Sequence, residues 1–191
     1  PARAKLLEIL RVAGAEQTLL TLQAAPDDLE AWEAFEEMVA ALGSRFSSCV
    51  LPEVTSPTEV RGLDARLTEI ESRLGLPLGH LRIEGCIRTE AALDQAYEIA
   101  TASRRVSALI FDIPVAELYG QGRLAVGAKT RSLRKAEYLL KGQLLVATSE
   151  AGIDAVDSLT RAGNRVSREA LDAANHGFSG KLARLDEVDE V

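Results

Sequence analysis

Acidic side chains stand within or next to short apolar segments of this 191-residue sequence. Glu84 lies in the alternating segment His80–Ile87, and Asp112 follows the apolar run Val106–Phe111. Both segments have the length and pattern of β-strands, and the stretch between them has helical spacing. Two buried strands joined by one helix form a parallel crossover unit, with both strand ends at one edge. We therefore predict that Glu84 and Asp112 lie close enough to hold one Mg²⁺, which prefers oxygen ligands.

An ion at this pair would stabilise the enolate that forms when a carbon–carbon bond beside a carbonyl breaks. The alternative is that both acids cap the following helices or are simply solvated. Glu53, Asp154 and Asp157 also fall near predicted strand ends, and for them we favour this alternative.

Basic and nucleophilic residues further limit the kinds of site that the chain could contain. Arg82 and Arg88 flank Glu84 and are candidates for binding a carboxylate or phosphate of a ligand, the alternative being ion pairs with nearby acids. His80 and His176 have no second His or Cys at ligand spacing, which argues against a transition-metal site. The chain has no Gly-x-Ser-x-Gly motif, so a serine hydrolase is not indicated.

The elements that would position these residues alternate along the chain. Strand patterns occur at Gln17–Ala24, Cys49–Glu53, His80–Ile87, Val106–Phe111, Ile153–Leu159 and Gly180–Leu185. Helical patterns occupy Pro1–Ala13 and the gaps between strands, and the glycine-rich Tyr119–Gly127 is predicted to be a loop over the mouth of a barrel. This order predicts one parallel α/β domain over residues 1–191, and periodicity alone leaves a barrel and an open sheet as alternatives.

Cap signals define several of the predicted helix ends. Thr89 is expected to cap a helix that continues to Ala100, and Ser56–Glu59 has the pattern of a capping box with Pro57 at the first helical position. Gly75 and Gly152 are expected to end the helices that precede them.

Composition limits the class of protein. Aromatic residues make up only 4% of the chain, so the core must be mainly aliphatic, and the net charge of −7 without a basic stripe argues against nucleic-acid binding. Cys49 and Cys86 fall in predicted strands, and we favour buried free thiols over a disulfide. The absence of a long apolar stretch and of a secretory signal leads us to expect a cytoplasmic protein without a membrane partner.

Four sequence runs, in their order, carry a resemblance to a known family. The runs are VLPEVTSPTEV (Val50–Val60), RIEGCIRTEAALDQAYEIATASRRVSALIF (Arg82–Phe111), EAGIDAVDSLT (Glu150–Thr160) and GFSGK (Gly177–Lys181). Together they resemble the citrate lyase beta subunit and its relatives, the malyl-CoA and citramalyl-CoA lyases and the 2-keto-diacid aldolases. The resemblance implies a TIM-type (β/α)₈ barrel, Mg²⁺ as cofactor, and cleavage of a carbon–carbon bond beside a carboxylate, often in an acyl-CoA thioester. It begins at the helix after the family's second strand, so we expect an incomplete barrel with about six strands.

The same resemblance assigns roles to individual positions. It implies that Glu84 is a metal ligand. The family's substrate-binding arginine falls near Thr21, its lysine on Glu53, and its metal-binding aspartate on Val115.

Two hypotheses follow from the resemblance. The first is a Mg²⁺-dependent carbon–carbon lyase that acts on a small hydroxy acid or its acyl-CoA thioester. The second is a degenerate relative that serves as a structural or regulatory subunit. Because an incomplete sheet exposes its edges, a homo-oligomer or a partner subunit is expected in either case.

Overall fold

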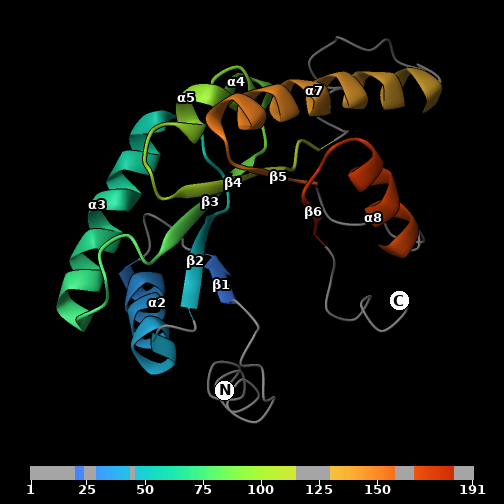
Figure 1. The fold of residues 1–191 in the computed structure, drawn as a ribbon. Helices are drawn as coiled ribbons and strands as arrows, with labels where there is room; N and C mark the ends of the chain where they lie inside the picture. Colours follow the sequence, from blue (N-terminus) through green and yellow to red (C-terminus); the bar gives the residue numbers. More distant parts are fainter. Residues whose placement is uncertain (1–19, 24–28, 44–45, 115–129, 158–165, 183–191) are drawn as a thin grey trace.

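Six parallel strands form one sheet in the part of the chain that the structure describes. The computed structural model describes residues 20–23, 29–43, 46–114, 130–157 and 166–182 (Figure 1). The strands pair in sequence order, each with the next, and the sheet curls (Figure 1). They are β1 Leu20–Gln23, β2 Phe46–Leu51, β3 Arg82–Ile87, β4 Val106–Phe111, β5 Asp154–Asp157 and β6 Gly180–Lys181.

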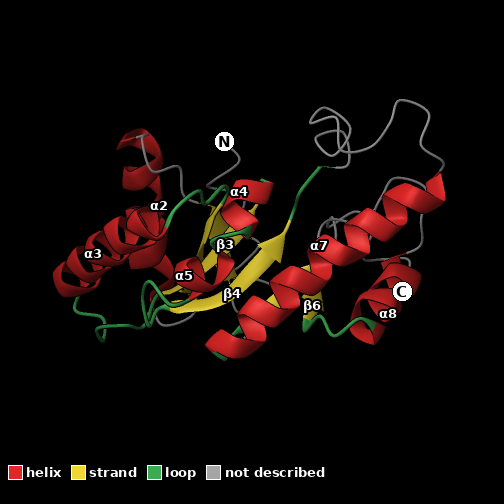
Figure 2. Ribbon diagram, turned by 90° about the horizontal axis from the view of Figure 1, so that it is seen from above, coloured by secondary structure: helices red, strands yellow, loops and turns green. Residues whose placement is uncertain are grey.

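Helices connect successive strands and lie along the outside of the curled sheet (Figures 1 and 2). They are α2 Leu29–Leu42, α3 Pro57–Leu74, α4 Glu90–Leu93, α5 Ala96–Ala100, α7 Thr130–Ala151 and α8 Val166–Asn175. A sheet of parallel neighbours in sequence order, with helices on its outer side, is an incomplete (β/α) barrel. The predicted fold class and the six predicted strands are therefore confirmed. The helix predicted at Pro1–Ala13 and the loop predicted at Tyr119–Gly127 lie outside the described residues.

The core fills the space between the sheet and its helices. In β3, Ile83 and Ile87 are buried in this core, whereas Arg82 and Glu84 are on the other face, as the alternation predicts. Gly85 also faces the core, where a Cβ would come within 3.1 Å of Leu109 and 3.2 Å of Val54. The backbone of β3 therefore packs too closely there for a larger side chain.

Both cysteines are buried and free, as predicted. Within the described residues, no helix is long and apolar enough to cross a membrane.

The predicted caps are confirmed in part. The hydroxyl of Thr89 accepts a hydrogen bond from the Ala92 amide at 3.1 Å, and Gly75 and Gly152 follow their helices with φ of +69°. The helix predicted to run from Thr89 to Ala100 is instead two short helices, because the chain turns at Asp94.

The capping box predicted at Ser56–Glu59 is wrong in its hydrogen bonds. Ser56 is at the N-cap position, but its side chain makes no capping bond. The Glu59 carboxylate instead accepts from the Thr55 amide at 3.0 Å and from the Thr55 hydroxyl, one residue further upstream. Glu59 therefore still satisfies a backbone donor near the start of α3, in place of the predicted reciprocal bond with Ser56.

A buried ion cluster joins α3 to the start of β4. The Arg105 guanidinium donates to Glu71 (2.7 Å to each oxygen), to Asp64, to the Thr68 hydroxyl (2.8 Å) and to the Leu81 carbonyl (3.0 Å). These contacts use all five of its N–H donors.

Glu71 is fully buried in the same cluster and also accepts from the amides of Gly79 and Leu81. Burial pushes the pKa of Glu71 upward, but the hydrogen bonds from Arg105, Leu81 and Gly79 outweigh it and lower that pKa. The hydrogen bonds that Arg105 donates to Glu71 in turn raise the pKa of Arg105. The cluster is thus a closed, fully paired structural unit.

Candidate functional site

The concave face of the sheet presents the residues that do not face the core. Strand register places Val50, Glu84, Ala108 and Asp154 opposite one another in a single row across β2 to β5. Asp154 is exposed and Glu84 is half-buried. The Ser48 hydroxyl donates to a Glu84 carboxylate oxygen at 2.7 Å. Glu84 lies within β3. Arg88, four residues later, lies just past the end of this strand.

The register does not bring Glu84 and Asp112 together. Glu84 is opposite Ala108, and Asp112 lies four residues further along, just past the end of β4. Its amide donates to the Ile87 carbonyl at 2.9 Å. At about 3.3 Å per residue, four residues amount to about 13 Å along the strand. This separation of the two backbone positions does not favour one ion held by both carboxylates.

Arg88 and Asp112 meet at the carboxyl ends of β3 and β4. Nε of Arg88 lies 3.4 Å from Oδ2 of Asp112, and the two side chains are 45% and 37% exposed. The alternative that Arg88 pairs with a nearby acid is thus confirmed. A guanidinium beside Asp112 compensates the negative charge that a metal ion would need.

The described residues do not fit a Mg²⁺ site at Glu84 and Asp112, because of this separation and this ion pair. They also contain no group of three or more His, Cys, Asp or Glu side chains that could hold a metal. Arg82 is exposed at the start of β3, two residues before Glu84. Arg82 and Arg88, the two arginines predicted to bind a ligand, therefore lie at opposite ends of β3.

Cys86 lies between the Glu84 row and the Arg88–Asp112 pair. Burial and the nearby charge of Asp112 raise the pKa of this thiol to about 11. The thiol is therefore protonated near neutral pH and is not an activated nucleophile.

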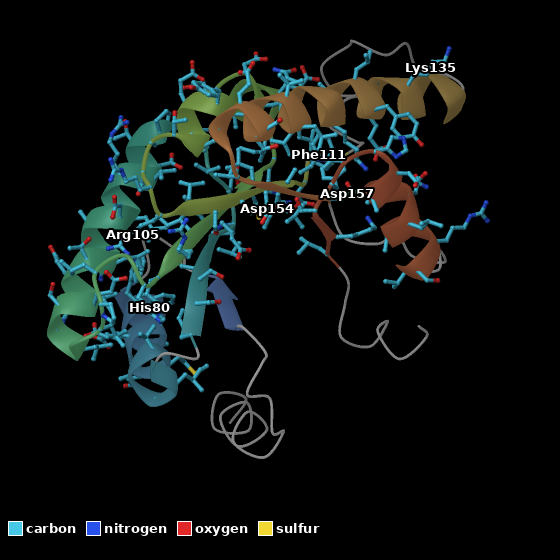
Figure 3. The ribbon with its side chains drawn as sticks, viewed as in Figure 1. His80, Arg105, Phe111, Lys135, Asp154 and Asp157 are labelled. Atoms are coloured by element: carbon cyan, nitrogen blue, oxygen red, sulfur yellow. The ribbon has the colours of Figure 1, made fainter. Side chains whose placement is uncertain are left out.

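Sequence reasoning missed an ion network that surrounds Asp157. The carboxylate of this buried residue binds Nζ of Lys141 at 2.7 Å and Nζ of Lys181 at 3.2 Å, and Lys181 also lies 3.3 Å from Glu169. Nζ of Lys141 is 5.6 Å from the centre of the Phe111 ring, and Figure 3 shows Phe111 and Asp157 below α7. The network joins α7, β5, β6 and α8. The repeated carboxylate in Asp154–Asp157 was visible in the sequence, but not the lysines that face it.

Among the other predicted positions that the structure describes, none forms an ion pair with Arg88 or Asp112. Thr21 is in β1, where the register places it opposite Ser48. Glu53 is exposed beyond the end of β2, and Val115 is outside the described residues. The ring of His176, at the end of α8, stacks on Tyr138, and the buried Nε2 of His80 has no hydrogen-bond partner among the described residues.

Residues 2–185 match the model of the HpcH/HpaI aldolase/citrate lyase family. The chain belongs to this family. The predicted relationship to the citrate lyase beta subunit is therefore confirmed, and the family supports a function of the lyase or aldolase type. A search of curated protein sequences gave no match.

Several solved structures have the same fold as this chain. RipC from Yersinia pestis is 23% identical, with a TM-score of 0.61 over 99% of this chain and 78% of that one. The Mycobacterium tuberculosis citrate lyase beta subunit, in complex with oxaloacetate and magnesium, is 21% identical, with a TM-score of 0.56 over 88% and 67%. A malate synthase from Haloferax volcanii is 18% identical, with a TM-score of 0.69 over 95% of this chain and 55% of that one. The chain therefore spans between about half and three quarters of these relatives.

Proposed function

We propose that the chain carries out carbon–carbon lyase or aldolase chemistry on a small hydroxy acid or its acyl-CoA thioester. The reaction takes place at the carboxyl ends of β3 and β4, because parallel α/β folds bind their ligands at this edge. The observation that carries the proposal is the half-exposed guanidinium of Arg88 at this edge.

Arg88 is suited to bind the carboxylate of such a substrate. Its Nε contacts Asp112, and its other nitrogens have no partner among the described residues. A guanidinium can donate two parallel hydrogen bonds to a carboxylate, which fixes both position and orientation. Asp112 acts as a positioning residue, because it holds the guanidinium at the strand end.

Mg²⁺ is the cofactor that the family resemblance implies, and for this chain it stays a prediction. We derive no step through the ion, because Glu84 and Asp112 do not fit one metal site. Isothermal titration calorimetry with MgCl₂ on wild type and Glu84→Gln tests the remaining prediction for Glu84. If both proteins bind Mg²⁺ equally, Glu84 is not a ligand.

The experiment that tests the function is a cleavage assay on malyl-CoA and citramalyl-CoA, with MgCl₂ or with a chelator. We expect wild type to release an acyl-CoA and a 2-oxo acid, and Arg88→Ala to lose about 100-fold in kcat/KM, because two charge-assisted hydrogen bonds are removed. Arg104→Ala, at an exposed arginine before β4, is the matched control and should keep wild-type activity. An unchanged rate in Arg88→Ala would disprove the role of Arg88.

A second candidate is a degenerate relative that acts as a structural or regulatory subunit. The ion pair of Arg88 with Asp112 favours this candidate, because the guanidinium compensates the negative charge that a metal ion would need. This candidate predicts no turnover of either thioester and no Mg²⁺ binding. Turnover by wild type that Arg88→Ala abolishes would exclude it.

A further inference from the structure

The solvent-facing side of α7 carries large apolar side chains. Leu139 is 76% exposed and Val146 is 59% exposed, whereas Leu144 on the opposite side is buried against the sheet. Lys135, Leu139, Gly142 and Val146 follow one another at intervals of four, three and four residues, and Figure 3 shows Lys135 near the far end of α7. This spacing places one residue per turn along a single seam, the pattern of a helix that packs against another helix.

Gly142 stands at the middle of this seam. A Cβ atom at Gly142 would meet nothing within 4 Å, so packing among the described residues does not require glycine there. Glycine inside a helix costs about 1 kcal/mol of stability relative to alanine. A small residue between two exposed apolar ones lets the backbone of a second helix approach closely.

The seam is complementary to itself in an antiparallel arrangement. Leu139 and Val146 lie equally far on either side of the midpoint of Gly142–Gln143, and so do Lys135 and Glu150. A two-fold axis through this midpoint therefore sets Leu139 of one copy against Val146 of the other. It also sets Lys135 of one copy against Glu150 of the other, so that opposite charges meet at both ends.

We propose that α7 is the docking surface for a second copy of this chain, in a two-fold antiparallel helix pair centred on Gly142–Gln143. A shallow groove of about 380 Å³ lies beside Val146 and is lined in part by Leu93, Ala96 and Tyr97. Leu139 of the second copy lies over this groove. The contact is confined to one helix and its neighbours α4 and α5, so the dimer forms reversibly and depends on concentration.

Cysteine cross-linking tests the geometry directly. The thiol introduced by Gly142→Cys meets its own copy at the two-fold axis, and the native Cys49 and Cys86 are buried and do not interfere. We expect mild oxidation to give a covalent dimer on a non-reducing gel. Leu171→Cys, at a 64% exposed leucine on α8, is the matched control and should remain largely monomeric. Equal cross-linking of both variants would overturn the proposal.

Sedimentation velocity over a concentration series tests the energetics. We expect Leu139→Glu to weaken the dimer at least tenfold, while Leu171→Glu leaves it unchanged. Lys135→Glu should weaken it, and the double change of Lys135→Glu with Glu150→Lys should restore it, because the charges again oppose one another. A wild-type chain that stays monomeric up to millimolar concentration, or a dimer that Leu139→Glu leaves intact, would overturn the proposal.

Discussion

Arg105 and Arg88 stand at opposite ends of the β3–β4 pair and differ in burial and in how many of their donors are bound. The Arg105 side chain is 7% exposed, and all five of its donors are bound to partners on α3 and the approach to β3. The Arg88 side chain is 45% exposed and contacts Asp112 through one nitrogen at 3.4 Å. The first arginine has no donor left for a ligand, and the second has several.

This difference separates a structural role from a ligand-binding role. A buried, fully paired guanidinium fixes the elements around it, and its loss leaves unpaired charges in the core. A half-exposed pair contributes little to stability, because water screens it. The amino-terminal ends of β3 and β4 are therefore closed by ion pairs, whereas at their carboxyl ends Arg88 keeps unbound donors.

The largest effect is expected on stability, in the closed cluster. Arg105→Met leaves the fully buried Glu71 without its main partner, which should cost about 3–5 kcal/mol in the free energy of unfolding. Urea denaturation measures this cost. Arg104→Ala, at the exposed neighbouring arginine, should change stability by less than about 0.5 kcal/mol. A loss below about 1 kcal/mol in Arg105→Met would show that the cluster is not a structural unit.

The opposite pattern is expected at the half-exposed pair of Arg88 with Asp112. Arg88→Ala should change the free energy of unfolding by less than about 1 kcal/mol, because the pair is exposed. The same variant should lose the carboxylate-dependent activity described above. Parallel denaturation and activity measurements separate the two effects. A large loss of stability in Arg88→Ala would mean that the two arginines play the same structural role.

Acid should affect the closed cluster through Glu71. Its folded pKa is lowered, so its contribution to stability is present above the unfolded pKa, about 4.3, and is lost as pH falls below that value. Thermal melting from pH 7 to pH 3 measures this loss. Glu71→Gln should show a shallower fall of stability than wild type in this range. The exposed neighbour Glu69 provides the control, since Glu69→Gln should keep the wild-type slope.

The smallest effect concerns Cys86, which lies between the two regions. Because its thiol is buried and has a pKa of about 11, we expect little reaction with a thiol reagent at pH 8 in the folded protein. Reaction should become complete in denaturant. Rapid modification of Cys86 in the folded protein would show that the open edge extends further into the sheet than the structure indicates.

The sequence was informative about the elements but not about their register. Apolar periodicity predicted each strand of the described sheet, because the period of two and the period of 3.6 are local properties. The position of Glu84 opposite Ala108 depends on how two strands slide past one another, which periodicity does not specify. The register separates Glu84 from Asp112 along the strands for this reason, so it gives no support to an ion shared by the two.

The ion clusters were missed for a related reason. Arg105 meets Glu71 across 34 residues of sequence, and Lys181 meets Asp157 across 24. A single sequence shows the charges but not the fold that brings them together. The sequence indicated that Arg88 could pair with a nearby acid, and the structure shows that this acid is Asp112.

The most direct test of the account is a calorimetric titration of oxaloacetate, a small dicarboxylate, into three proteins: wild type, Arg88→Ala and Arg104→Ala. The account predicts binding by wild type and by Arg104→Ala, and its loss in Arg88→Ala, whose fold stays intact. Binding that survives in Arg88→Ala would contradict a carboxylate site at the ends of β3 and β4. Absence of binding in all three proteins would contradict it as well, and would favour the non-catalytic subunit.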